Sequence, residues 1–260
     1  MWSVMIWQAS FAIRVVILVR GFQAKALRKF PFFYAYAFST LAADLFLYAT
    51  WKWIAVAKPD AYQEVYWTGQ FLTLMIGCGI VLEIFRHILM PYPGADKFAT
   101  AVALGTFAAI FCFALGYQFL THEGLGLALK GTTFVLERDV RTVQAIFLFG
   151  ILAVISYYRI PIGRNLKGMV AGYGLYIVTS LSTLAIRAYA GPGFNNAWNV
   201  IQPVSFDVSL AIWLIALWSY QPNPAPDPTV PLEEDYEMLA RRTRRALASM
   251  RSHLTKAARP

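Results

Sequence analysis

Seven long apolar segments, separated by short polar ones, run from the first residues of the chain to about residue 220. A helix needs about 20 mostly apolar residues to cross a bilayer, because each residue rises ~1.5 Å through a hydrocarbon layer ~30 Å thick. Lipid offers no partners to unpaired backbone groups, and the segments are too long and alternate too little for barrel strands. The pattern therefore predicts an all-α, polytopic membrane protein, a seven-transmembrane-helix bundle. The predicted spans are Trp2–Val19, Phe30–Trp53, Val65–Phe85, Phe98–Phe119, Val135–Tyr158, Gly168–Ala188 and Asn199–Tyr220.

The composition agrees with a membrane protein. Hydrophobic residues make up 58% of the 260 residues and charged residues only 14%, with a mean hydropathy of +0.50. Soluble proteins usually carry about 25% charged residues, so this chain has too few for a water-soluble protein. The same composition excludes a disordered chain, a secreted disulfide scaffold and a fibrous repeat. The two cysteines, Cys78 and Cys112, lie inside apolar segments, where a free thiol packs as a small apolar side chain. The three histidines are far apart in the sequence, so no metal site is predicted.

The net charge of +9 predicts the orientation of the bundle rather than nucleic-acid binding. The short loops of a multi-span protein keep their lysine and arginine residues on the cytoplasmic side. If the N-terminus lies outside, the three inner loops and the C-terminal tail hold most of the 23 basic residues. We therefore expect the N-terminus out and the C-terminus in.

The composition changes sharply after the seventh span. Five closely spaced prolines favour a stiff, extended linker at 221–231, between a transmembrane domain at 1–220 and a tail at 232–260. Apolar residues recur in the tail at steps of three and four, which predicts a basic, amphipathic cytoplasmic helix. Its acidic start and arginine-rich remainder both suit the helix dipole. We expect this helix to lie in solvent or on anionic lipid, or to dock a cytoplasmic partner.

Ionisable residues inside the spans are the places where function is most expected, since each costs a few kcal/mol unless it is paired or wet. Asp44 and Asp207 lie too deep for a short carboxylate to reach water, so each needs a cation, a proton or a cavity. They either tie helices together or form a protonation or ligand site. Arg14 and Arg187 are among the available cations, although Arg14 lies close enough to the inner end of its span to snorkel to the interface.

Glu83 marks the inner boundary of the third span. Arg86 and His87 follow it by three and four residues and share its helical face. This spacing predicts an ion pair between Glu83 and Arg86 that anchors the span.

Gly168 and Gly172 give the sixth span a small-xxx-small face, followed by Gly174. Such a face lets another helix approach closely. We expect helix packing there rather than binding.

The densest group of polar residues begins the fifth span. Glu137, Arg141 and Gln144 are spaced i, i+4, i+7 and share one helical face, and Arg138 precedes Arg141 by three residues. Two guanidiniums and an amide at the outer leaflet can clamp a carboxylate or a phosphate, because arginine presents a fixed fork of donors. The same groups can instead form a structural network with nearby carboxylates, Asp207 among them. The sequence leaves both possibilities open.

Several chemistries lack the residues that they require. The last span contains no lysine, so retinal cannot be held there as a Schiff base. Gln202-Pro203 reverses the Pro-Gln motif of sugar-transporting seven-helix proteins. No nucleotide-binding loop, zincin helix or nucleophile elbow occurs in an aqueous segment. No cofactor is therefore evident, although bound lipid or pigment can fill grooves between helices.

Three motifs along the chain are typical of one protein family. They are Arg28-Lys29-Phe30-Pro31-Phe32-Phe33, Glu83-Ile-Phe-Arg86 with Pro91-Tyr92-Pro93-Gly94, and Glu137-Arg138-x-x-Arg141-x-x-Gln144. Through these motifs, and over most of its length, the chain resembles an uncharacterised family of bacterial seven-span integral membrane proteins. The family has no assigned activity, so the resemblance implies a multi-pass protein of the bacterial inner (cytoplasmic) membrane and no catalysis.

We therefore expect a non-enzymatic scaffold, anchoring or accessory subunit of a bacterial membrane complex. Its partners would be the lipid bilayer, another membrane protein or a second copy of the chain, and no nucleic acid. The alternative is a seven-helix sensor or transporter that binds an anionic or amphipathic small molecule near the outer end of the fifth helix. No catalytic or metal-binding residue is expected. The candidate ligand or network residues are Asp44, Glu137, Arg138, Arg141, Gln144, Arg187 and Asp207.

Overall fold

The computed structural model describes residues 2–53, 59–121, 125–225, 227 and 230–257, and among them eight α-helices and two short 3-10 helices but no strand. Seven of these helices are long and apolar enough to cross a membrane. The predicted all-helical fold class and its seven apolar spans are thus confirmed. The helices are α1 (Trp2–Gln23), α2 (Pro31–Trp53), α3 (Pro59–Leu89), α4 (Pro93–Thr121), α5 (Leu125–Tyr158), α6 (Arg164–Ala190), α7 (Asn195–Ala216) and α8 (Leu232–Ala257), and the 3-10 helices are η1 (Ala26–Arg28) and η2 (Gly191–Phe194).

Most of the spanning helices run beyond the apolar segments that predicted them. α3 begins at Pro59 rather than Val65, and α5 begins at Leu125 rather than Val135. Polar and glycine residues at these ends carry no signal for a span, yet continuing the helix satisfies their backbone hydrogen bonds. α7 differs from this trend at its C-terminal end. It stops at Ala216, four residues before the predicted end at Tyr220.

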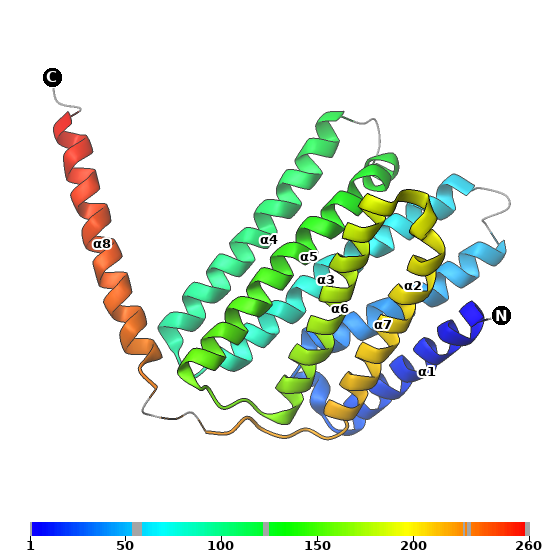
Figure 1. Ribbon diagram of the computed structural model, residues 1–260, viewed down its shortest axis with the longest axis horizontal. Coiled ribbons are helices and arrows are strands. Elements are labelled where there is room, and N and C mark those ends of the chain that lie inside the picture. Colours follow the sequence, from blue (N-terminus) through cyan, green and yellow to red (C-terminus); the bar gives the residue numbers. More distant parts are fainter. Residues whose placement is uncertain (1, 54–58, 122–124, 226, 228–229, 258–260) are drawn as a thin grey trace.

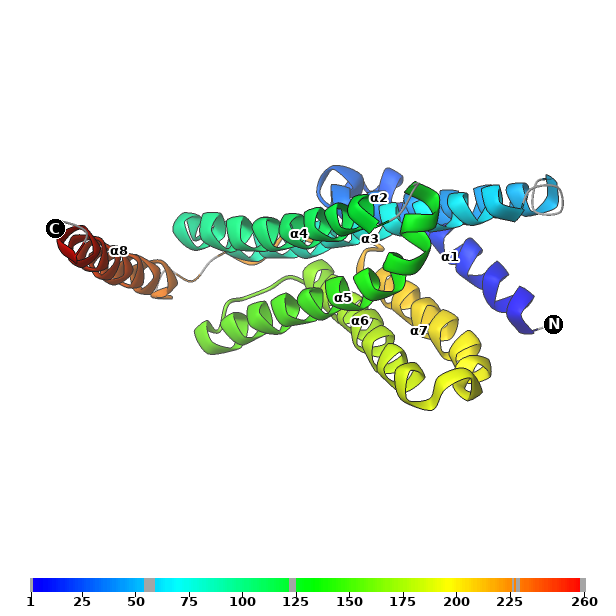
Figure 2. The ribbon, with the colours of Figure 1, turned by 90° about the horizontal axis from the view of Figure 1, so that it is seen from above.

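Six helices form a closed ring. α1 packs against α2 and α7, α3 joins α2 to α5, and α6 joins α5 to α7. α4 lies outside this ring, against α3 and α5. Seen from above, α2, α3 and α4 lie along one side and α6 and α7 along the other, with α1 at the edge between α2 and α7 (Figure 2). Successive helices run in opposite directions, so the start of α1 and the end of α7 mark opposite ends of the bundle, here named the N-terminal end and the C-terminal end (Figure 1).

α6 and α7 pack closely through the two small residues of the predicted motif. A Cβ added to Gly168 would lie 2.0 Å from the Cβ of Ala216, and one added to Gly172 would lie 2.4 Å from Nε1 of Trp213. A Cβ on Gly174 would meet nothing within 4 Å. The motif therefore brings α7 against α6, as expected from small residues at a membrane-helix interface.

An aromatic cluster closes the middle of the ring. The ring centroid of Trp213 lies 5.1 Å from that of Phe33, 6.3 Å from that of Tyr173 and 6.4 Å from that of Tyr36. All four side chains are buried. We call these four residues the aromatic plug, because they fill the space between α2, α6 and α7.

Glu83 takes a different partner from the one predicted. Its carboxylate is 4% exposed and accepts hydrogen bonds from the backbone N–H of Phe32 (3.1 Å) and Phe33 (2.9 Å). Arg86 is exposed, and among the described residues no ion pair joins it to Glu83. The structure therefore differs from the expected pair because the first N–H groups of α2 lack partners in their own helix, and Glu83 supplies them.

The chain after α7 is tied to the C-terminal end of the bundle. Glu233, in the first turn of α8, accepts hydrogen bonds from the N–H groups of Gly94 (2.7 Å) and Ala95 (3.3 Å) at the start of α4. The hydroxyl of Tyr158 donates to Asp235 over 2.9 Å. The remainder of α8 runs away from the bundle (Figure 1).

Candidate functional site

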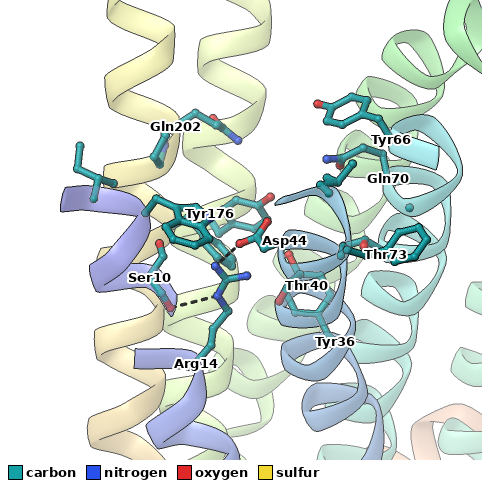
Figure 3. Close-up of a pocket in the computed structure, with 18 of the residues that line it drawn as sticks. Ser10, Arg14, Tyr36, Thr40, Asp44, Tyr66, Gln70, Thr73, Tyr176 and Gln202 are labelled. Atoms are coloured by element: carbon teal, nitrogen blue, oxygen red, sulfur yellow. Dashed lines mark hydrogen bonds and ion pairs between the residues drawn. The ribbon is translucent and has the colours of Figure 1, made fainter. Parts of the chain in front are cut away.

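A cavity of about 470 Å³ lies inside the ring, between α1, α2, α3, α6 and α7. It begins near the N-terminal end, where Gln70 and Asn199 are exposed, and it reaches down to the buried side chains of Arg14 and Tyr36. Figure 3 shows polar side chains that line this space from all five helices. We call it the central cavity.

Arg14 is the buried charge of the central cavity. Its side chain is 3% exposed, and its Nε donates to the carbonyl oxygen of Ser10 over 3.1 Å. Its Nη2 donates to the carboxylate of Asp44 on α2, which is 30% exposed (Figure 3). The guanidinium also lies 5.8 Å from the ring centroid of Phe206. Arg14 therefore points into the bundle, and the expectation that it snorkels to the interface is wrong.

Asp207 also finds its partner on α1. Its carboxylate, partly buried on α7, accepts a hydrogen bond from the hydroxyl of Ser10. Ser10 and Arg14 lie one turn apart on α1, so this helix contacts one aspartate on α2 and one on α7. Both deep carboxylates noted in the sequence thus have polar partners inside the ring.

A smaller pocket of about 40 Å³ adjoins the central cavity beside α5, and we call it the side pocket. It shares the walls formed by Tyr36, Gln70, Thr73 and Tyr176 with the central cavity. The two spaces therefore adjoin each other at these four residues.

Arg141 lies in the side pocket and is held by Glu137 and Tyr176. Its Nε donates to Glu137 over 2.9 Å, and its Nη2 donates to the hydroxyl of Tyr176 over 2.9 Å. Its guanidinium carbon lies 4.5 Å from the centroid of the Tyr176 ring. Glu137 and Arg141 therefore form an ion pair one helical turn apart, against the aromatic face of α6.

Gln144 lies deeper in the same pocket. The side chain is fully buried, and its Nε2 lies 3.5 Å from Sγ of Cys78. Its Oε1 is buried and has no hydrogen-bond partner among the described residues. The helical face predicted from Glu137, Arg141 and Gln144 thus lines one pocket.

Gln202 contributes a satisfied amide to the wall of the central cavity. Its Nε2 donates to the hydroxyl of Ser180 over 2.7 Å, and its Oε1 accepts from the hydroxyl of Thr183 over 3.0 Å. Both partners belong to α6, so this network joins α6 and α7 where Pro203 interrupts the α7 backbone hydrogen bonds.

Two predicted site residues lie elsewhere. Arg138 is 57% exposed and pairs with Asp139 over 3.0 Å. Arg187 lies with its guanidinium carbon 5.3 Å from a ring centroid of Trp198. Neither residue lines the central cavity or the side pocket, so the structure does not form the clamp of two arginines considered from the sequence.

Sequence reasoning missed the tyrosines of the site. Tyr36, Tyr173 and Tyr176 resemble ordinary aromatic residues of a span when each is read on its own helix. A signal was present on α3, where Gln70, Thr73 and Gly77 have the spacing of one helical face. Ser10 and Arg14 give a similar signal on α1.

The arrangement is suited to binding. It combines an aromatic and aliphatic wall with a few polar groups that are held in place by hydrogen bonds. Among the described residues no group of three or more His, Cys, Asp or Glu side chains could hold a metal ion. No protein-family model, curated protein or solved structure matches the chain.

Proposed function

We propose that the chain is a seven-helix sensor or transporter that binds a small amphipathic molecule in the central cavity. The observation that carries the proposal is the cavity itself, about 470 Å³ in volume and built by five helices around a buried arginine. Binding pockets for small molecules in proteins measure about 300–1,000 Å³ and carry a few placed polar groups in an apolar wall.

The lining favours an amphipathic molecule over a simple anion. Trp7, Phe46 and Phe206 offer apolar surface, while Thr73 and Asn199 add polar groups to the wall. The charge of Arg14 is already balanced by Asp44, so an added anion would have to displace that carboxylate. The ligand's apolar body therefore supplies most of the binding, and its polar groups set its orientation.

The proposed location is the bacterial inner membrane, with the N-terminus outside. The positive-inside rule supports this orientation, since basic residues gather in the loops and the tail at the C-terminal end. The central cavity would then face the outer compartment. Reporters fused to each terminus that report from opposite compartments would support this placement, and reporters on the same side would contradict it.

A substitution at Gly69 tests the proposed binding site. Gly69 lines the central cavity, and a Cβ added there meets nothing within 4 Å, so Gly69→Leu fills the cavity without a clash at its first carbon. Gly105 on α4 is exposed and equally open, so Gly105→Leu makes the same chemical change away from the cavity.

The measurement is mass spectrometry of the organic extract from each protein, purified in polymer-bounded discs of its native membrane. We expect a small amphipathic molecule that is enriched with the unmodified protein and with Gly105→Leu, and reduced at least tenfold with Gly69→Leu. Equal recovery from both variants would contradict binding in the central cavity.

A scaffold or accessory role is the second candidate, and α8 favours it. Apolar Met238, Leu239, Leu247 and Met250 are exposed on this arginine-rich helix. An exposed amphipathic helix of this kind suits an anionic lipid surface or a partner protein. Deletion of residues 232–260 should release a co-purifying partner if this role is the main one, and unchanged co-purification would contradict it.

A further inference from the structure

The side pocket contains an acceptor without a donor. Oε1 of Gln144 is buried and lacks a hydrogen-bond partner among the described residues, although the opposite end of the amide contacts Cys78. A buried polar atom without a partner is costly and uncommon in a folded protein. Because Gln144 lines the side pocket, a group bound in that pocket is the natural partner for this atom.

The charges of the side pocket cancel. Glu137 and Arg141 form an ion pair at 2.9 Å, and the other residues of the wall are uncharged. A charged group placed there would have no opposite charge to offset the loss of its hydration. The pocket therefore suits an uncharged group that donates a hydrogen bond.

The size of the side pocket limits that group to a few atoms. Its volume of about 40 Å³ has room for a few water-sized groups, since a cavity needs about 10–15 Å³ of such space to hold one water molecule. A hydroxyl fits this space, can donate to Oε1 of Gln144 and can accept from the guanidinium of Arg141.

We propose that the side pocket binds the hydroxyl of an uncharged amphipathic alcohol whose apolar body occupies the central cavity. The shared walls of the two spaces support this placement, because the wall residues Tyr36, Gln70, Thr73 and Tyr176 face both. The inference rests on the proposed function and names its ligand class. A water molecule offers the same O–H chemistry, so the experiment must separate the two sources.

Three probes with one carbon skeleton test the head group: phenylbutanol, phenylbutylamine and phenylbutyrate. Each is titrated into the full chain in lipid nanodiscs, and its Kd is obtained from the saturable rise of the unfolding midpoint. We expect phenylbutanol to bind at least tenfold tighter than the amine or the carboxylate. This ranking uses the unmodified protein, so it does not depend on the folding of any variant.

Gln144→Met removes the acceptor while nearly preserving side-chain length. We expect the Kd of phenylbutanol to rise about tenfold, the loss of one hydrogen bond in a buried site, with little change for the other probes. Gln8, which is exposed on α1 outside both spaces, supplies the matched control, and Gln8→Met should leave all three Kd values unchanged.

The outcomes separate this inference from the proposed function. Binding of all three probes with equal Kd, abolished by Gly69→Leu but unchanged by Gln144→Met, would mean that only water occupies the side pocket and would overturn the inference alone. Tighter binding of the amine or the carboxylate would also overturn it. Absence of saturable binding of every probe to the unmodified protein would count against the central cavity as a binding site.

Discussion

The guanidinium of Arg14 donates to the carboxylate of Asp44 inside the ring, where Arg14 is 3% exposed and Asp44 30% exposed. This pair connects α1 to α2 at the floor of the central cavity. Its two members differ in access to water, and this difference makes their substitutions unequal. A charge left alone in a buried position costs more than one that water can still reach.

Asp44→Leu should lower the free energy of unfolding by about 3 kcal/mol, because it leaves Arg14 buried without its carboxylate. Arg14→Met should cost less, since Asp44 keeps contact with water. The double variant should recover much of the loss, because no unpaired charge remains. Titration with sodium dodecyl sulfate, followed by tryptophan fluorescence, measures these differences.

The exposed pair of Arg138 and Asp139 provides the control for that cycle. Their side chains are 57% and 49% exposed, so removing either charge should change the free energy of unfolding by less than about 0.5 kcal/mol. A loss from Asp44→Leu no larger than this control would contradict a buried pair at Arg14.

Glu83→Ala should destabilise the protein by about 1–2 kcal/mol, because α2 loses the acceptor for its first two N–H groups. Arg86→Gln should have almost no effect, since its side chain is exposed. Thermal unfolding in detergent measures both. Equal destabilisation by the two substitutions would instead support the ion pair between Glu83 and Arg86 that the sequence predicted.

Gly168→Ala should destabilise the contact between α6 and α7 by roughly 1–3 kcal/mol, because its new methyl group overlaps Ala216. Gly174→Ala, on the same helix with open space around it, should be neutral or slightly stabilising. The free energy of unfolding of the two variants decides the comparison. Similar values for both would show that α6 and α7 do not approach as closely as described.

Glu233→Ala should release the first turn of α8 from α4, since its carboxylate holds the N–H groups of Gly94 and Ala95. Limited digestion with trypsin should then cleave the arginine-rich part of α8 several-fold faster. Glu234 is exposed and makes the matched control, so Glu234→Ala should be cut at the rate of the unmodified protein. An unchanged rate for Glu233→Ala would contradict the anchoring contact.

The sequence predicted the seven spans because apolar length is a property of one segment at a time. The shared face of Glu137, Arg141 and Gln144 was predictable for the same reason, since helical spacing fixes it. Partners on other helices were not predictable in this way. Ser10 meets Asp207 across 197 positions of sequence only because α1 closes the ring against α7.

Helical spacing gave the wrong contact where a residue found its hydrogen-bond or ion-pair partner on another helix. Glu83 has Arg86 one turn away, yet it accepts from the start of α2, whose first N–H groups need a partner. Arg14 lies near enough to the C-terminal end of α1 to reach an interface there, yet its guanidinium pairs with Asp44 inside the ring. In both cases the contact depends on which helices pack against each other, and a single sequence does not reveal that arrangement.

The aromatic plug lies between the central cavity and the C-terminal end of the ring, because Tyr36 lines the cavity and its ring packs against Trp213, close to the end of α7. A bound molecule that moved toward that end would meet Tyr36 first and Trp213 behind it. Its passage would require both rings to move, and Pro203 already interrupts the backbone hydrogen bonds of the helix that carries Trp213. Under the proposed function, this closed end favours a sensor over a transporter.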